Sequence, residues 1–108
     1  MTEARLTSAM LASALIRRAN GAGGVATVVV KGDPTSGVIL VQTLEKGREI
    51  GLFERVSDYR GGWRLMACGA GADDMPQYIE RRRRADPDLW IIELDIPEAE
   101  RFAAETIC

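Results

Sequence analysis

The stretch IERRRRADPDLWIIELD, from Ile79 to Asp95, passes from a charged helix through a proline-containing turn into an apolar strand. Four successive arginines suit the C-terminal end of a helix, where the macrodipole favours cations. Asp86 and Asp88 flank Pro87, and this acidic break precedes an apolar run that is led by a tryptophan. The stretch therefore predicts a helix that carries the chain across a sheet and supplies one more strand to it.

Upstream of this stretch the sequence predicts one helix and four strands. Leucine, isoleucine and alanine recur at helical spacing over residues 8–20, and the glycines that follow end this helix. Four apolar runs then predict strands, which are Val25–Lys31, Gly37–Leu44, Glu49–Val56 and Trp63–Cys68. Because the first two runs are apolar at nearly every position, we expect both to be central strands that are covered on two faces.

Downstream elements complete the predicted fold. The crossover helix opens near Pro76, the fifth strand is Leu89–Leu94, and a short C-terminal helix begins at Pro97. The order of elements predicts an α+β fold with an antiparallel sheet of about five strands, in which a four-strand meander is joined by a fifth strand after the crossover helix. We expect the fifth strand beside the first. No linker or repeat divides the chain, so residues 1–108 are expected to form a single domain.

Composition excludes several functions. The chain has 108 residues, of which 46% are hydrophobic and 28% are charged, as in ordinary globular proteins. It contains no histidine, so neither a histidine-activated nucleophile nor the usual zinc site can be assembled. We therefore expect no catalytic residue, no metal and no cofactor, which favours a non-enzymatic role.

Two observations bear on location. The only cysteines, Cys68 and Cys108, provide no disulfide framework, which favours a reducing compartment. The apolar N-terminal run is followed directly by Arg17 and Arg18, unlike a signal peptide, and no run is long enough to span a membrane. We expect a cytoplasmic protein without a membrane partner.

The arginine run Arg81–Arg84 cannot share one helical face, because successive residues are about 100° apart. Arg82 falls on the apolar side of the helix, so we expect it to be partly buried and paired with a carboxylate. The nearest candidates in sequence are Asp86, Asp88 and Glu93. The other three arginines are expected to be solvated: Arg81, Arg83 and Arg84.

The net charge of −2 is unevenly distributed. Residues 1–72 carry nine basic and six acidic side chains, whereas residues 73–108 carry five and ten. The arginine run thus lies in the acidic part of the chain, which disfavours the long-range positive field that attracts nucleic acid. It also lacks interleaved aromatic residues on which bases stack.

Three further features have both a structural and a functional interpretation. GDPTSG, residues 32–37, fits a hairpin turn better than an anion-binding nest of backbone N–H groups. Trp63 and Trp90 lie in apolar runs, and we expect both in the core. Four carboxylates could bind a hard cation or act as acid and base, but turn and strand positions explain them better. They are Asp86, Asp88, Glu93 and Asp95.

Four segments of the chain resemble one known family. They are ARL at residues 4–6, SALIRRANGAGGVATVVVKGD at 13–33, GVILVQ at 37–42 and DPDLWIIELD at 86–95. The family is domain of unknown function 1491, which is associated with alphaproteobacteria. The resemblance implies a cytosolic, single-domain α+β protein, and it brings no assigned activity, cofactor or catalytic residue.

These observations favour a small interaction module that binds another protein or itself, for example as a homodimer. An uncovered edge or face of the sheet would form the apolar centre of its interface, with Arg17, Arg81, Arg83 and Arg84 as the polar rim. The alternative is a small-ligand or nucleic-acid binder that uses Arg81–Arg84. A pocket lined by Arg18, Arg82 and the carboxylates would favour that alternative.

Overall fold

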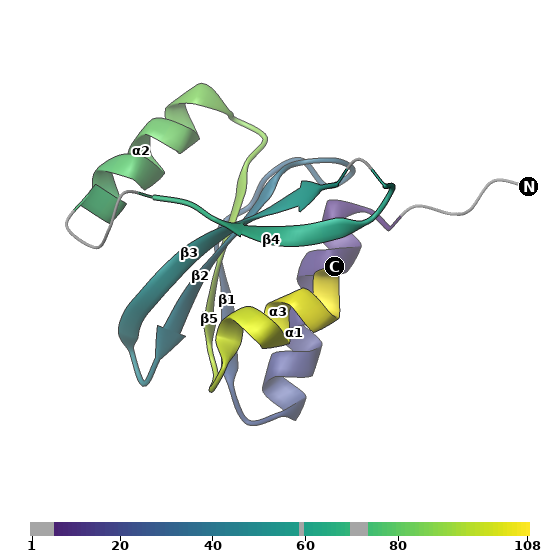
Figure 1. Cartoon of the computed structure of the whole chain (residues 1–108), viewed down its shortest axis with the longest axis vertical. Coiled ribbons are helices and arrows are strands. Elements are labelled where there is room, and N and C mark those ends of the chain that lie inside the picture. Colours follow the sequence, from purple (N-terminus) through teal and green to yellow (C-terminus); the bar gives the residue numbers. More distant parts are fainter. Residues whose placement is uncertain (1–5, 59, 70–73) are drawn as a thin grey trace, which may run out of the picture.

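The computed structural model describes residues 6–58, 60–69 and 74–108, and in them three helices accompany one five-stranded sheet (Figure 1). The α+β prediction is confirmed. None of the helices in the described residues is long and apolar enough to cross a membrane. In chain order the elements are α1 (Ser8–Gly21), β1 (Val25–Val30), β2 (Ile39–Glu45), β3 (Arg48–Ser57), β4 (Trp63–Ala67), α2 (Met75–Ala85), β5 (Trp90–Asp95) and α3 (Ala99–Ile107).

The strands lie in the order β1-β5-β2-β3-β4. β5 is antiparallel to β1 and parallel to β2, whereas the β2–β3 and β3–β4 pairs are antiparallel. The expected pairing of the fifth strand with the first is therefore present. The sheet differs from the expected four-strand meander in one place, because β5 is inserted between β1 and β2.

The loop from Lys31 to Val38 explains this insertion, because it crosses the beginning of β5 instead of forming a hairpin. The N–H of Asp33 donates to the carbonyl of Asp88 at 3.0 Å, and the indole Nε1 of Trp90 donates to the carbonyl of Asp33 at 2.7 Å. Gly32 and Gly37 allow this close approach, since a Cβ on either would overlap the Asp88 carbonyl oxygen.

The side chain of Asp33 forms hydrogen bonds with the backbone of the same loop. One carboxylate oxygen of Asp33 accepts the backbone N–H of Thr35 at 3.2 Å and that of Ser36 at 2.8 Å. Ser8, at the start of α1, donates its hydroxyl to the carbonyl of Gly37 at 2.7 Å. The loop is therefore neither a hairpin turn nor an open anion nest, because Asp33 already occupies the donors that an anion would use.

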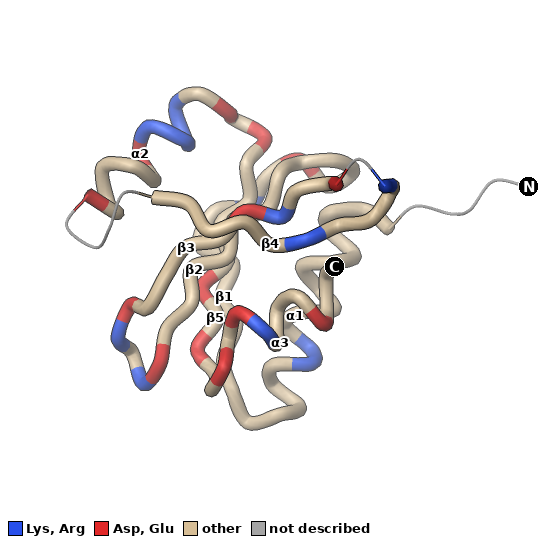
Figure 2. The backbone as a smooth tube through the Cα atoms, viewed as in Figure 1, with Lys and Arg blue, Asp and Glu red and all other residues tan. Residues whose placement is uncertain are grey.

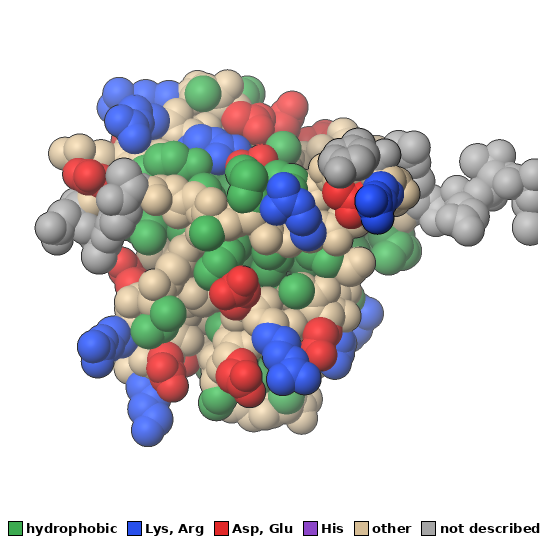
Figure 3. Space-filling view, viewed as in Figure 1, with side chains coloured by type: hydrophobic (Ala, Val, Ile, Leu, Met, Phe, Trp, Pro, Cys, Tyr) green, Lys and Arg blue, Asp and Glu red, His purple; other side chains and the backbone are tan. Residues whose placement is uncertain are grey.

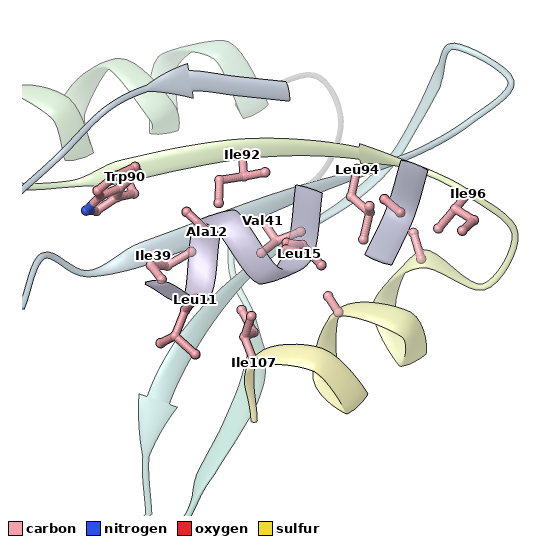
Figure 4. Close-up of a cluster of buried hydrophobic side chains, with 13 residues drawn as sticks. Leu11, Ala12, Leu15, Ile39, Val41, Trp90, Ile92, Leu94, Ile96 and Ile107 are labelled. Carbon is pink, nitrogen blue, oxygen red and sulfur yellow. The ribbon is translucent and has the colours of Figure 1, made fainter. Parts of the chain in front are cut away.

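Apolar side chains cover both faces of the sheet. On the first, which we call the α1/α3 face, both helices pack on alternate residues of β2 and β5 (Figure 4), among them Ile39, Val41, Trp90, Ile92 and Leu94. On the second, the α2 face, a smaller cluster comprises Leu40, Leu52, Met75, Leu89 and Ile91. Ile107 of α3 belongs to the first cluster, and Phe102 packs against it.

Two burial predictions are wrong. β1 is an edge strand, and the side chains of Val25 and Val29 are 58% and 51% exposed, so only β2 of the first two strands is central. Trp63 is 45% exposed, whereas Trp90 is 3% exposed in the core. Both errors have one cause: an apolar run does not reveal which strand the topology places at the edge.

Candidate functional site

Helix α2 rests on the sheet through one side. Only Met75 is buried, Tyr78, Ile79 and Arg82 are half-buried, and every other described residue of the helix is exposed. Arg82 is thus the arginine of the run that turns towards the sheet, while Arg81, Arg83 and Arg84 are exposed.

Arg82 pairs with Glu54 of β3, at 2.8 Å between Nη1 and Oε1, and the same nitrogen donates to the hydroxyl of Tyr78 at 2.8 Å. The expectation that its partner would be Asp86, Asp88 or Glu93 is wrong. Tyr78 and Ile79 of α2 pack on the cluster on the α2 face, so the carboxylate that Arg82 reaches lies on β3, 28 residues away in sequence.

A thiol and a phenol adjoin this ion pair. Burial raises the pKa of Cys68, although a hydrogen bond with Tyr78 opposes the increase. Burial likewise raises the pKa of Tyr78. Burial alone would lower the pKa of Arg82, but its hydrogen bonds to Glu54 and Tyr78 outweigh that effect and raise it. The cluster therefore holds Cys68 as a neutral thiol at neutral pH, which does not suit a nucleophile.

We predict that Arg82→Ala lowers the free energy of unfolding by about 1–3 kcal/mol, because it leaves the Glu54 carboxylate half-buried without its partner. The matched control is Arg84→Ala in the same helix. Arg84 is exposed, and its one ion pair within the described residues is with Glu80, at 3.4 Å, so its removal is expected to cost less than about 0.5 kcal/mol. Urea titration followed by circular dichroism measures both, and equal losses would contradict the assignment.

The remaining predicted arginines lie elsewhere. Arg17 and Arg18 are exposed on α1; Arg18 donates to the hydroxyl of Thr106 at 2.9 Å, and its guanidinium carbon lies 5.2 Å from the ring centre of Phe102. These contacts are on the α1/α3 face, opposite Arg81–Arg84, as the separation of the two helices in Figure 2 illustrates. Arg17 thus does not share one polar rim with the α2 arginines, and Arg18 and Arg82 do not line one pocket.

The predicted carboxylates are also dispersed. Asp86 accepts the N–H of Asp88 at 3.0 Å in the turn after α2, and Glu93 lies on the α2 face beside Thr27 and Gln42. Asp95 accepts the backbone N–H groups of Lys46 and Gly47 at 2.9 and 2.7 Å, which holds the β2–β3 turn. Within the described ranges, no group of three potential ligands could hold a metal ion.

Two open cavities flank the β2–β3 hairpin. One, of about 280 Å³, lies between β3 and the end of β4, and the other, of about 330 Å³, lies between the hairpin and the beginning of α3. Ile50, Phe53 and Ile96 line the second, together with Glu45, Glu98 and Glu100. Among the described residues no arginine lines either cavity, so neither matches the anion pocket that the alternative function requires.

Strand β4 is the surface that sequence reasoning missed. Among the described residues it pairs only with β3, and four of its five side chains are exposed. Trp63 is 45% and Met66 39% exposed, and the guanidinium carbon of Arg55 lies 3.7 Å from the Trp63 ring centre. β4 faces the viewer in Figure 1, and green and blue side chains adjoin one another over it in Figure 3.

The hydrogen-bond pattern of the described residues shows which backbone groups of β4 bond to β3 and which point outward. The N–H of Cys68 donates to the carbonyl of Leu52, and that of Asp58 donates to the carbonyl of Gly62, both at 2.9 Å. Because hydrogen-bonded pairs alternate along an antiparallel ladder, residues 64 and 66 bond to β3. The N–H and C=O groups of residues 63, 65 and 67 consequently point away from the sheet.

One sequence signal was available for this surface. WRLMA is a short run that mixes arginine with large apolar residues. Such a mixture is typical of an edge strand, where both faces meet water. Because Trp63 lies in an apolar run, the sequence alone predicts a core position for it, which its 45% exposure contradicts.

Comparisons with known proteins agree with this fold. The crystal structure of a DUF1491 family protein from Caulobacter crescentus CB15 has 32% sequence identity and a TM-score of 0.79, and the match covers 91% of this chain and 94% of that chain. An NMR structure of a DUF1491 family protein from the same organism has 32% identity and a TM-score of 0.76, with 93% and 94% covered. The solution structure of protein Atu0922 from Agrobacterium tumefaciens has 34% identity and a TM-score of 0.68, with 86% and 87% covered.

Both organisms are alphaproteobacteria, as the sequence resemblance implies. None of the curated proteins matches the chain. The sequence profile described as protein of unknown function (DUF1491) matches residues 6–104. The chain therefore belongs to the DUF1491 family.

Proposed function

We propose that the protein is a non-enzymatic interaction module that receives an extended strand of a partner along the free edge of β4. The observation that carries the proposal is the row of outward backbone groups at residues 63, 65 and 67. A sheet edge with free N–H and C=O groups is a template for one more strand, whose main chain supplies affinity while alternate side chains supply specificity.

The side chains around this edge support the proposal. Trp63 combines a large exposed ring with a fixed position, because Arg55 stacks on it and also donates from Nε to the carbonyl of Ile107 at 2.6 Å. Burial lowers the pKa of Arg55, yet an arginine remains charged at any physiological pH. Tryptophan and arginine are enriched among the residues that dominate binding energy, so Trp63 is the proposed anchor.

The opposite edge of the sheet is less suitable. β1 has an irregularity between Val28 and Val30, where its register with β5 shifts. Such a bulge disrupts the regular spacing of backbone groups and is one way in which proteins prevent pairing at an edge. β4 has a continuous register with β3, from Trp63 to Ala67.

The arginine run Arg81–Arg84 is less well suited to bind an anionic ligand than β4 is to bind a strand. Arg82 is held by Glu54 and Tyr78, and Arg84 pairs with Glu80, so part of the positive charge is already compensated.

A cytoplasmic location is part of the proposal: Cys68 and Cys108 are both free thiols, which suits a reducing compartment.

Photo-crosslinking in the native host tests the proposal. A photoreactive amino acid at Met66 is expected to give a discrete protein adduct, whereas the same group at Met10 of α1, which is 52% exposed on the opposite side, is not. Ala67→Pro removes one outward N–H without removing a bond to β3 and should abolish the adduct; Ala67→Ser keeps the N–H and should retain it. No adduct at Met66, or one that persists in Ala67→Pro, would refute the proposal.

A further inference from the structure

We propose that the partner strand is β4 of a second copy of this chain, paired antiparallel about a two-fold axis at Leu65. This inference rests on the proposed function and names its partner. Leu65 would lie opposite Leu65 of the second copy, Trp63 opposite Ala67, and Arg64 opposite Met66. A two-fold axis makes the interface self-complementary, since each contact occurs twice.

The backbone favours this register. Residues 63, 65 and 67 present outward N–H and C=O groups, and the two-fold arrangement places each of them opposite another outward residue. All of the free groups between the two strands would then be paired. A shift by one residue would instead set outward groups against groups that already bond to β3. A shift by two residues would leave residue 63 or 67 of each copy without a partner in β4, so the register centred on Leu65 pairs the most groups.

Side-chain sizes also fit on the α1/α3 face. Ala67 is opposite Phe53 within the sheet. Across the joined sheet, Trp63 of one copy would therefore be followed by Ala67 and then Phe53 of the second copy. The small alanine leaves room for the large indole, which would approach the phenyl ring of the next strand. Leu65 would meet its own copy at the centre of the same face, and cross-strand apolar and aromatic pairs of this kind stabilise a sheet.

A long side chain also fits on the α2 face. Met66 is opposite Glu54 within the sheet, so the methylene stem of Arg64 of one copy would lie over Met66 of the other. The two Arg64 guanidinium groups would stand diagonally across the axis, each near a Glu54 whose charge Arg82 of the same chain already compensates. Arg55, on the other face, would be separated from its copy by both Leu65 residues.

Two strands of five residues bury less surface than a typical stable interface of about 1,600 Å². We therefore expect a reversible dimer with a dissociation constant on the order of 10 µM. Sedimentation velocity from about 1 to 500 µM should show a shift from monomer to dimer. A chain that stays monomeric at the highest concentration overturns the inference; a Met66 adduct to a different protein would then still support the proposed function.

Substitutions distinguish dimerisation through the β4 edge from dimerisation through the β1 edge. Ala67→Pro and Arg64→Glu are each expected to weaken dimerisation at least tenfold, the first by removing an N–H and the second by removing the long stem that would lie over Met66. Val29→Lys, on the other edge strand, should leave dimerisation unchanged. Circular dichroism verifies that each variant folds. Arg64 is exposed, so Arg64→Glu keeps the test valid if the proline variant does not fold.

A thiol placed at the axis tests the register directly. Opposed residues of a hydrogen-bonded antiparallel pair have Cα atoms about 5.5 Å apart, within disulfide range. In a Cys68→Ala, Cys108→Ser background, Leu65→Cys should therefore form a covalent dimer under mild oxidation much faster than Val29→Cys. Equal rates, or a faster reaction at residue 29, would overturn the inference, as would a dimer that persists in Ala67→Pro.

Discussion

Gly37→Ala is expected to lower the free energy of unfolding by about 3 kcal/mol, near the upper end of the usual cost of overpacking. The added Cβ would overlap the carbonyl oxygen of Asp88 and lie 2.9 Å from Cδ1 of Trp90. That oxygen belongs to the backbone and accepts the N–H of Asp33, so it cannot rotate away as a side chain would. The loop would have to withdraw from the beginning of β5, with loss of the bond between Trp90 and Asp33.

Gly21→Ala provides the control for this substitution. Gly21 is the last residue of α1, and no atom lies within 4 Å of a Cβ added there. Alanine is favoured over glycine in a helix, so the free energy of unfolding should stay constant or rise by a few tenths of a kcal/mol, up to about 1 kcal/mol. Urea titration of the two variants decides the matter: a loss below about 1 kcal/mol in Gly37→Ala would show that the loop tolerates a side chain.

Trp90→Ala should be similarly damaging, with an expected loss of about 3–5 kcal/mol. The side chain is 3% exposed in the cluster on the α1/α3 face, so truncation leaves a cavity between β5, β2 and α1. The indole also donates to the carbonyl of Asp33 at 2.7 Å, and alanine removes that bond. Trp90→Phe keeps an aromatic ring and loses the donor, so we expect an intermediate cost of about 1–2 kcal/mol.

Trp63→Ala provides the control for Trp90→Ala. Trp63→Ala should cost less than about 1 kcal/mol when measured at a concentration where the chain is monomeric, because the side chain is 45% exposed and its main contact is the stacked Arg55. Thermal unfolding followed by circular dichroism measures all three variants. Similar losses for Trp63→Ala and Trp90→Ala would contradict the burial described for these two residues.

Local patterns sufficed to predict the helices and strands. The periodicity of residues 8–20 and the four apolar runs gave element boundaries close to those observed, because those features depend on neighbours in sequence. The place of β5 between β1 and β2 depends on how the loop around Gly37 packs against Asp88, which no local pattern reveals. The exposure of Val25 and Trp63 depends in turn on which strands that insertion leaves at the edges.

The candidate site was only partly predictable for the same reason. Helical geometry correctly separates Arg82 from its exposed neighbours, since it requires only the angle between successive residues. The partner of Arg82 is Glu54 of β3, 28 residues earlier in the sequence. The predicted partners were carboxylates close to Arg82 in sequence. The β4 edge required the full order of strands, together with the register that sets residues 63, 65 and 67 outward.

The insertion of β5 also has a consequence during synthesis. The ribosome makes β1 to β4 before β5. Among the described strands, β1 has β5 as its sole neighbour, and β2 has β5 as one of two. A nascent chain that ends before Trp90 thus carries an unpaired β1 and a β2 with one open side. Such exposed apolar strands are prone to aggregate, and their pairing is slow because the partners are distant in sequence. The strand that joins β1 to the rest of the sheet is therefore the last to be made, and β1 must stay soluble until β5 arrives.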